Sequence, residues 1–420
     1  MSALASCGLL LVLGLRALAE QNDDSSGKER FCLEKLADHL SRPVALEMIG
    51  EDVLIGEHRG KISRMNLHTG IVSDVVDLSG RLLTSQSWMD HRGLLSLLVV
   101  QTDDVEKPRR TLLLTSSRTS SNPEADHDTV ISAIPFDENG KLDVEKEYEL
   151  TRVSQPSNRY NGGQLLAQLD KGFLYLTTGD GAMKYQQSKR FDMDSSNGKI
   201  LKMKIKLPSS SEADELASVR ERSIFASGFR NPWRCALDTR EVSRGRTQFF
   251  CGDTAIDPHP EEEIFLVRQG KRYGFPIAEA QADDEQAIYK YSLETGAAVV
   301  GGRVYKGNGL PSLNDTFLFG DYVSGKIFTL AEAPSGVWKA NDLNASDWCS
   351  SSTPAKLHIV AFAENHYGDL LILADDASRD GSQKGMILKL RQISGASKPL
   401  SGYGKYIAIG LLFFFFQTVI

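Results

Sequence analysis

Short apolar runs alternate along the chain with polar turns that contain Gly, Asp or Asn, and four segments share one hairpin pattern. In each segment an apolar strand leads into a polar turn, and a glycine then opens a second, alternating strand. These glycines are Gly60, Gly198, Gly325 and Gly385. They are separated by 138, 127 and 60 residues, so that each long gap is about twice the short one. This spacing indicates a repeat of about 60 residues, with one further unit in each long gap.

Both long gaps contain apolar runs of their own, as the missing units require. Residues 111–117 and 128–137 lie in the first gap, and 247–253 and 261–270 lie in the second. Six units of short strands, with almost no helical periodicity, predict an all-β fold, a six-bladed β-propeller of four-stranded blades. Radial closure allows such a chain to avoid long exposed sheet edges. A pair of β-sandwiches is the alternative, and a helix is expected only in the acidic segment 209–222.

The N-terminal residues 1–19 have the layout of a signal peptide. An apolar run of about a dozen residues precedes Ala17-Leu18-Ala19, the small-x-small pattern of a signal peptidase site. The run is too short to span a bilayer, which needs about 20 apolar residues. We therefore expect a secreted chain, with a linker at 20–30. A buried N-terminal helix is the alternative.

The C-terminal residues 394–420 have the three-part layout of a GPI-attachment signal. Small residues begin at Ser394, a short polar spacer follows, and an apolar tail runs from Ile407 to Ile420. We expect a lipid anchor at or near Ser394, and a location on the extracellular face of the plasma membrane. A short membrane span and a buried C-terminal strand are the alternatives. The propeller is expected to occupy residues 31–393.

The cysteines agree with an oxidising compartment. Once Cys7 leaves with the signal peptide, four cysteines remain, an even number that is compatible with two disulfides. Cys235 and Cys251 flank a predicted strand-turn-strand and form the expected local pair, which leaves Cys32 to pair with Cys349. Metal binding is the less favoured alternative, because no Cys-x-x-Cys is present.

The charge of the chain excludes one class of partner. The formal net charge is −7 in 420 residues, and no Lys/Arg block or interleaving of basic with aromatic residues is present. Nucleic acid is therefore not an expected partner. Asn314 and Asn344 each begin an Asn-x-Ser/Thr sequence, which a secreted chain can present for N-glycosylation.

Four segments carry a resemblance to a known family. They read "HRGLLSLL" at 91–98, "FASGFRNPWRCALD" at 225–238, "EEEIFLVRQGKRYGFP" at 261–276 and "VYKGNGLPSLNDTFLFGDYVSGKI" at 304–327. Together with a "CLEK" segment near the N-terminus, they resemble the glucose/sorbosone dehydrogenase family of quinoprotein propellers, in its hedgehog-interacting-protein-like branch. The Arg-Asn-Pro stretch is the most specific of these motifs. The six blades of that family agree with the spacing of the hairpins.

The resemblance implies two classes of function. The soluble enzymes of the family hold pyrroloquinoline quinone (PQQ) and a calcium ion over the central channel, and they oxidise an aldose while a histidine takes the hydroxyl proton. By this resemblance the chain is a PQQ- and calcium-dependent oxidoreductase that acts on a small sugar or alcohol. The hedgehog-interacting branch instead implies a non-enzymatic extracellular binding module, whose protein partner the sequence does not identify.

The resemblance assigns individual residues to the quinone. Arg230 and Asn231 match the pair that contacts it, and Lys306 stands where the family has a cofactor-contacting lysine. His91 stands in the place of a polar cofactor neighbour, and Asp180 matches the acid that partners the catalytic base. Arginine suits this role because its planar guanidinium binds carboxylates without losing its charge. A structural role is the alternative for Arg230, which would brace the channel wall through Asp180.

The resemblance also implies calcium ligands. Ala255 and Ile256 fall where main-chain carbonyls bind the calcium ion at the cofactor. Glu262, Glu263 and Tyr273 keep the spacing of a second calcium site, in which carboxylates and a main-chain oxygen supply hard ligands. Solvated surface is the alternative for the two glutamates.

One residue departs from the family pattern at the place of the chemistry. The catalytic histidine of the family belongs to His-Asn-Gly-Gly, and here Tyr160 precedes Asn161-Gly162-Gly163. A phenol with a reference pKa of about 10 is a poor base at neutral pH compared with an imidazole at about 6.5. Impaired sugar oxidation is therefore expected.

The predicted catalytic pair and the Arg-Asn pair are expected to meet at one side of the channel mouth, because they lie in loops of neighbouring repeats. Two alternatives concern the missing base. His58 or His91 could take its role, or Tyr160 could serve only as a plug stacked over the channel mouth.

Overall fold

The computed structural model describes most of the chain between residues 29 and 393. The gaps lie at 86, 88–89, 103–107, 183–191, 208–215, 243, 255–260, 274–283, 346, 352–355 and 377–383. The expected signal peptide, 1–19, and the expected anchor region with Ser394 lie outside the described residues. Contacts divide the chain into one large unit, Cys32–Arg391, and a second unit formed by the two ends. Within the described ranges, no helix is long and apolar enough to cross a membrane.

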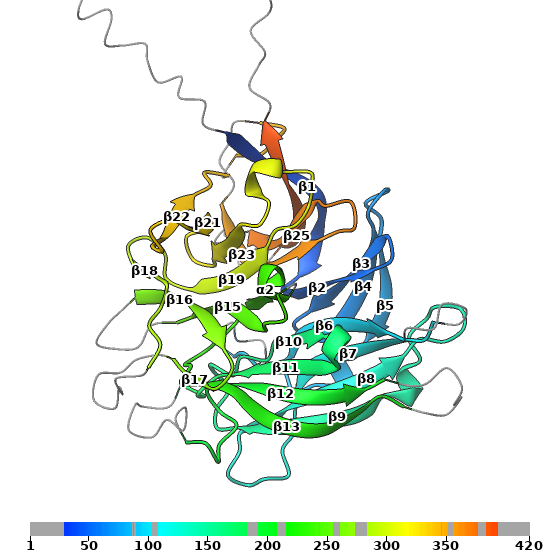
Figure 1. The fold of residues 1–420 in the computed structure, drawn as a ribbon. Helices are drawn as coiled ribbons and strands as arrows, with labels where there is room; N and C mark the ends of the chain where they lie inside the picture. The colour runs from blue at the N-terminus through cyan, green and yellow to red at the C-terminus, as the bar shows by residue number, and fades with distance from the viewer. Residues whose placement is uncertain are drawn as a thin grey trace, which may run out of the picture. The chain divides into compact units, whose positions relative to one another are not determined.

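Six sheets of the large unit form the blades of a β-propeller (Figure 1). In blades 1 to 5 the antiparallel strands follow one another in the sequence from the innermost strand outward. Blade 1 consists of β2 (Pro43–Ile49), β3 (Asp52–Glu57), β4 (Lys61–Asn66) and β5 (Val72–Asp77). Blade 2 consists of β6 (Leu94–Gln101), β7 (Arg110–Arg118), β8 (His127–Pro135) and β9 (Tyr148–Gln155). Blade 3 consists of β10 (Leu165–Gln168), β11 (Phe173–Thr178), β12 (Lys199–Lys206) and β13 (Ser218–Ser227).

The next two blades have the same order. Blade 4 consists of β14 (Cys235–Leu237), β15 (Gln248–Asp253), β16 (Glu261–Arg268) and β18 (Tyr289–Ser292). Blade 5 consists of β19 (Val299–Val304), β20 (Phe317–Asp321), β21 (Ile327–Glu332) and β22 (Trp338–Asp342). A short additional strand, β17 (Lys271–Arg272), pairs in parallel with β13 at the edge of blade 3.

Blade 6 closes the ring by combining the first strand with the last three. Its order is β23 (Leu357–Glu364), β24 (Leu370–Asp376), β25 (Lys384–Ile393) and, outermost, β1 (Arg30–Ser41). A disulfide between Cys32 and Cys349 ties the start of this strand to the segment that leads into β23. Because β1 pairs with β25 in one sheet, the ring is closed by backbone hydrogen bonds and not by side-chain contacts alone.

The innermost strands surround a central channel. Contacts run from β2 to β6, β10, β14, β19 and β23 and back to β2. Gly60, Gly198, Gly325 and Gly385 all lie between the second and third strands of their blades or at the start of the third, and the two expected extra units are β7–β8 and β15–β16. The predicted six-bladed propeller of four-stranded blades is therefore confirmed.

The core lies between the faces of neighbouring blades. Aliphatic side chains such as Leu54, Leu97 and Leu112 fill the space between blades 1 and 2. Aromatic rings dominate further round, where Tyr175, Phe225 and Phe249 meet edge to face between blades 3 and 4. Burying each such side chain contributes about 2 kcal/mol to folding. These layers hold the inner strands in place around the channel.

The helix expected in 209–222 is not formed where the structure describes this segment. Residues 218–222 belong to β13 and pair with β12, as in Lys206↔Ser218 and Lys204↔Glu221. The outer strand is largely exposed, so its charged residues fit either structure by propensity, and pairing with β12 decides between them. The regular helical turns described are α2 (Thr239–Val242), η1 (Ser79–Arg81), η2 (Val144–Lys146), η3 (Leu169–Lys171) and η5 (Pro311–Leu313).

Candidate functional site

The expected site residues gather at one end of the channel. The strands of a blade alternate in direction, so the loop that enters each inner strand shares an end with the turn between the second and third strands. Tyr160 enters β10, Arg230 and Asn231 enter β14, and Asp180 follows β11. Together with His91, which enters β6, these residues form what we call the entry rim. The prediction that they lie on one side of the channel mouth agrees with the contacts given below.

Tyr160 is held in an unusual backbone conformation. Its φ is 51°, in the left-handed region, and its carbonyl oxygen accepts a hydrogen bond of 3.0 Å from the N–H of Gly181. A Cβ at Gly179 would lie 1.8 Å from that oxygen, so only glycine allows the two backbones to approach this closely. The loop after β11 thus fixes Tyr160 at the rim.

The ring of Tyr160 contacts a cation and an imidazole. The guanidinium carbon of Arg230 is 4.8 Å from the ring centroid, within the range of a cation–π contact. The ring of His91 meets Tyr160 edge to face at 5.9 Å. Tyr160 therefore covers one side of the guanidinium, as a plug over the channel mouth would.

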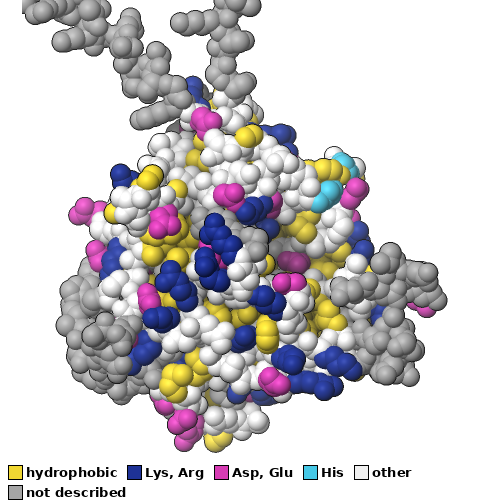
Figure 2. Space-filling view, in the orientation of Figure 1, with side chains coloured by type: hydrophobic (Ala, Val, Ile, Leu, Met, Phe, Trp, Pro, Cys, Tyr) yellow, Lys and Arg dark blue, Asp and Glu magenta, His cyan; other side chains and the backbone are white. Residues whose placement is uncertain are grey.

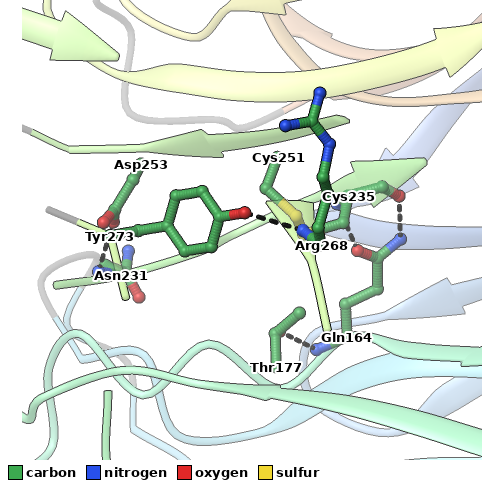
Figure 3. Close-up of a disulfide and its surroundings, with 8 residues drawn as sticks. All are labelled: Gln164, Thr177, Asn231, Cys235, Cys251, Asp253, Arg268 and Tyr273. Carbon is green, nitrogen blue, oxygen red and sulfur yellow. Dashed lines mark hydrogen bonds between the residues drawn. A yellow bond between two sulfur atoms is a disulfide. The ribbon is translucent and has the colours of Figure 1, made fainter. Parts of the chain in front are cut away.

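A buried carboxylate fixes the turn that carries Arg230 and Asn231. Asp253, at the end of β15, accepts hydrogen bonds from the backbone N–H of Arg230 at 2.9 Å and of Asn231 at 2.6 Å. Burial raises the pKa of Asp253 to about 7, against the two N–H groups, which stabilise its ionised form. The amide oxygen of Asn231 in turn accepts the N–H of Gly162 at 3.1 Å. Figure 3 shows Asp253 directed at Asn231.

Asp180 is joined to Arg230 twice. Its backbone N–H donates to the carbonyl oxygen of Arg230 at 2.8 Å, and its carboxylate lies 3.5 Å from Nη1 of the same residue. Nε of Arg230 is buried and has no hydrogen-bond partner in the part of the chain that the structure describes. The bracing role is therefore compatible with the geometry, and it leaves one buried guanidinium donor without a partner among the described residues.

The two histidines considered as substitute bases are held neutral. Burial first, and then the charge of Arg42, lower the pKa of His91 to about 4 and that of His58 to about 3. The N–H of Tyr160 donates to Nδ1 of His91 at 3.3 Å, which places the proton of a neutral ring on Nε2. Near neutral pH neither histidine has the basicity that proton abstraction needs.

Two further histidines at this end were not identified from the sequence. His127 is fully buried, with Nδ1 2.9 Å from Asp126 and Nε2 3.5 Å from the amide of Asn161, and burial lowers its pKa. His358, at the start of β23, stacks on Tyr322 and donates Nδ1–H to the carbonyl oxygen of that residue at 2.6 Å. His127 starts β8, the third strand of blade 2, and His358 lies at the start of the inner strand β23. A histidine at the start of a strand was the available signal, but single residues of this kind are common.

Lys306 is not brought to the entry rim. It follows the other end of β19, where its Nζ contacts Asp315 and its backbone N–H donates to Glu364 at 3.2 Å. A strand rises about 3.3 Å per residue, so this end is a whole strand length away from Arg230. Lys306 therefore lies at the far mouth of the channel. The expected contact of this lysine with a cofactor at the entry rim does not fit its position.

The two glutamates expected to bind calcium point away from each other. They are neighbours on β16, where successive side chains face opposite sides of the sheet. Glu262 accepts the N–H of Val299 at 2.9 Å, whereas Glu263 forms an ion pair of 2.7 Å with Lys290. Their spacing in the sequence therefore does not bring them together as ligands.

The side chain of Tyr273, whose main-chain oxygen was the expected ligand, packs in the core. Its ring stacks on Phe229 at 5.4 Å, and its hydroxyl accepts the N–H of Arg268 at 2.7 Å (Figure 3). Ala255 and Ile256 lie outside the described residues. Among the residues that are described, no three His, Cys, Asp or Glu side chains form a group that could hold a metal ion.

Comparison with known proteins identifies the family. The model of the glucose/sorbosone dehydrogenase family matches residues 40–345. The chain belongs to this family.

Curated relatives include hedgehog-interacting protein. The human protein is 22% identical over 379 residues, which cover 86% of this chain and 52% of the relative. The HIPL2 protein of Arabidopsis thaliana is 27% identical over 260 residues, which cover 51% of this chain and 36% of the relative. The chain thus spans about half the length, or less, of these relatives.

Solved structures share the fold. The soluble aldose sugar dehydrogenase of Escherichia coli, in its apo-form, superposes with a TM-score of 0.64 at 18% identity, covering 86% of this chain and all of that one. A second structure, described as a glucose dehydrogenase, gives a TM-score of 0.62 at 18% identity, covering 86% of this chain and 99% of that one. At this identity the likeness shows the propeller fold alone.

In this glucose/sorbosone dehydrogenase family chain, a disulfide lies below the entry rim. Cys235 and Cys251 are register partners in β14 and β15 and are bonded, as expected. Gln164 exchanges two hydrogen bonds with the backbone of Cys235, at 3.1 and 2.5 Å, and its own N–H donates to Thr177 (Figure 3). These contacts link blade 3 to blade 4.

The described part of this family member includes a channel cavity, a surface groove and both glycosylation candidates. The channel contains a cavity of about 440 Å³, and a groove of about 990 Å³ lies near α2. Figure 2 shows Lys and Arg side chains gathered around α2. The basic residues that line the groove are Lys171, Lys202, Arg244, Arg246 and Arg268. Asn314 and Asn344 are exposed, as glycosylation requires, and their modification stays a prediction.

Proposed function

We propose that the entry rim binds PQQ and that the chain is an impaired sugar or alcohol oxidoreductase of its family. The observation that carries the proposal is Arg230: its backbone is fixed by Asp253, and its buried Nε has no protein partner among the described residues. A guanidinium with a spare donor fits a carboxylate-bearing, planar ligand. PQQ, when bound, supplies the hydride acceptor, and the protein supplies position and charge.

Proton transfer is the step that this rim supports poorly. Tyr160 stands in the place of the family histidine, and His58 and His91 are held neutral by burial. Loss of a general base typically costs 10²- to 10⁴-fold in rate. The proposed activity is therefore a trace of the oxidation that the family performs.

Calcium belongs to this proposal only through the main-chain oxygens of Ala255 and Ile256. At the expected second site, both carboxylates are otherwise engaged: Glu262 accepts the N–H of Val299, and Glu263 pairs with Lys290. Calcium would polarise a carbonyl of the bound quinone.

The location is also a proposal. We infer a secreted protein, attached by a lipid near Ser394 to the extracellular face of the plasma membrane. Two disulfides support an oxidising compartment, and the exposed Asn314 and Asn344 are accessible for glycosylation.

A non-enzymatic binding module is the second candidate. The groove near α2 favours it, because its five basic side chains outnumber its three acidic ones and Trp338 and Phe173 line the same hollow. Arg244 and Arg246 are about two-thirds exposed, although both pair with Glu241. A groove of this composition suits an acidic segment of an extracellular protein. One relative of this chain is hedgehog-interacting protein, and the chain aligns with about half of the length of that protein.

A titration with PQQ tests the first proposal. Purified protein is titrated with PQQ and Ca²⁺ while the absorbance of the quinone is followed. Arg230→Gln should weaken binding at least tenfold, whereas Lys306→Gln, a cation at the far mouth, should leave it within a factor of two. If the wild-type protein causes no absorbance change, the binding module becomes the favoured function. Equal affinities of wild type and Arg230→Gln would contradict the assigned clamp.

A further inference from the structure

Arg234 extends across the channel instead of lining its wall. It directly precedes β14 in blade 4, and its Nη2 donates to the carbonyl oxygen of Val44 in blade 1 at 2.6 Å. The same atom donates to Leu95 in blade 2 at 3.1 Å. Blades 1 and 4 lie opposite each other in a ring of six, so the guanidinium crosses the channel. It thereby separates the entry rim from the cavity beyond.

Among the described residues, no carboxylate compensates the charge of Arg234. Only 6% of the residue is exposed, and burial, with no opposing contribution from a charged group, lowers its pKa to about 10. It therefore remains protonated at neutral pH. The guanidinium lies 4.8 Å from the ring centroid of Trp233, and Nη1 has no hydrogen-bond partner among the described residues. Arg234 has carbonyl and aromatic partners but no opposite charge, and a buried charge that no opposite charge compensates is costly.

The cavity of about 440 Å³ begins at Arg234 and is lined by all six inner strands. Its other cations already have partners: Arg303 pairs with Glu364, and Lys306 pairs with Asp315. Glu47, on β2, accepts the N–H of Val99 at 2.9 Å. Arg234 is thus the cation of this lining that keeps a donor for a ligand.

We propose that the channel cavity binds a small carboxylate anion, held by Nη1 of Arg234. A guanidinium forms stronger hydrogen bonds with a carboxylate than with neutral groups, and the anion supplies the missing charge. The cavity is far larger than a halide ion, so an organic group has room beyond the carboxylate. The site is independent of the proposed PQQ site, because Arg234 lies between the two.

Calorimetric titration with sodium acetate tests the proposal on the full mature protein, without PQQ. The wild type should bind one acetate per chain. Arg234→Met should weaken binding at least twentyfold, and Arg234→Lys, which keeps the charge but loses the planar fork, should weaken it three- to tenfold. Lys306→Gln is the matched control, since it removes a cation of the same cavity that already has a partner, and it should change the affinity less than twofold.

Three results would overturn the proposal. The first is absence of acetate binding by the folded wild type up to 200 mM, roughly a hundredfold above the millimolar range of a single weak ion pair. The second is chloride binding as tight as acetate, which would identify a halide site. The third is an Arg234→Lys variant that binds acetate as tightly as the wild type, together with a Lys306→Gln variant that binds it more weakly. This result can be obtained even if Arg234→Met does not fold.

Discussion

At the scale of single residues, the entry rim combines an arginine whose backbone is fixed by a buried carboxyl group with a histidine that burial keeps neutral. Arg230 is held through its backbone by Asp253 and through its carbonyl by Asp180. His91 gives up Nδ1 to the N–H of Tyr160 and is kept neutral by burial. The contacts that position Arg230 and the burial that keeps His91 neutral therefore arise from different parts of the rim.

The motif that identified Arg230 could be read from the sequence, but the contacts that fix the position of Arg230 could not. Asp253 follows an apolar strand in an ordinary way, and only the fold brings it under the backbone of Arg230. Lys306 shows the opposite case: its motif matched, but it follows the end of β19 that faces the far mouth. Linear spacing does not tell which end of a channel a residue occupies.

Glu47 provides a prediction on pH dependence. Burial raises its pKa from an ordinary 4.5 to about 7, so the folded protein holds this proton more tightly than the unfolded chain. Stability from this group is fully present below pH 4.5 and is lost as pH rises through 7. Glu47→Gln keeps an acceptor for Val99 and removes this loss. Its free energy of unfolding relative to wild type should therefore rise by up to about 3 kcal/mol between pH 5 and pH 8.

Urea unfolding at the two pH values measures this difference. Glu332→Gln is the control, because Glu332 is an exposed carboxylate at the end of β21. It should shift stability equally at both pH values. A Glu47→Gln difference that is the same at pH 5 and pH 8 would show that Glu47 is not held neutral.

At the scale of elements, hairpins were predictable because their pattern is local. Alternation and a turn glycine mark the second and third strands of blades 1, 3 and 5, and these strands are buried enough to keep the signal. The helix predicted for residues 218–222 was wrong, because an exposed outer strand carries charged residues that suit a helix equally well. Its pairing partner β12 settles the conformation.

The turn after β11 supports a second prediction. Gly179→Ala places a Cβ 1.8 Å from the carbonyl oxygen of Tyr160, which no side-chain rotation can relieve. The substitution should lower the free energy of unfolding by about 1 to 3 kcal/mol and displace Tyr160. Gly80→Ala is the matched control, because a Cβ there meets nothing within 4 Å. Thermal unfolding of both variants compares them, and equal midpoints would contradict the close approach.

At the scale of the whole molecule, the number of blades followed from arithmetic on the repeat, whereas the crossing of the channel by Arg234 did not. The contact from Arg234 to Val44 joins residues 190 positions apart, and nothing in the local sequence of either predicts it. The pairing of Cys32 with Cys349 was accessible only because four cysteines allow few pairings.

Attachment to the membrane belongs to this scale as well. If the C-terminal segment is a GPI signal, phosphatidylinositol-specific phospholipase C should release the protein from the surface of expressing cells. The released form should lack residues 407–420, as mass spectrometry of its C-terminal peptide will show. A protein that stays with the membrane and retains those residues would instead indicate a span.

The central claim is the proposal that Arg230 still binds PQQ whereas Tyr160 does not replace the family's catalytic histidine as a base. Steady-state oxidation of glucose by the PQQ- and Ca²⁺-loaded protein tests it most directly. Wild type should turn over at least a hundredfold more slowly than the usual enzymic range of about 1 to 10³ per second, and Tyr160→His should raise that rate by at least tenfold. Tyr160→Phe, which removes only the hydroxyl, should match wild type. The account would be contradicted if the wild type turned over within the usual enzymic range and neither Tyr160→Phe nor Tyr160→His changed that rate. Another group would then serve as the base.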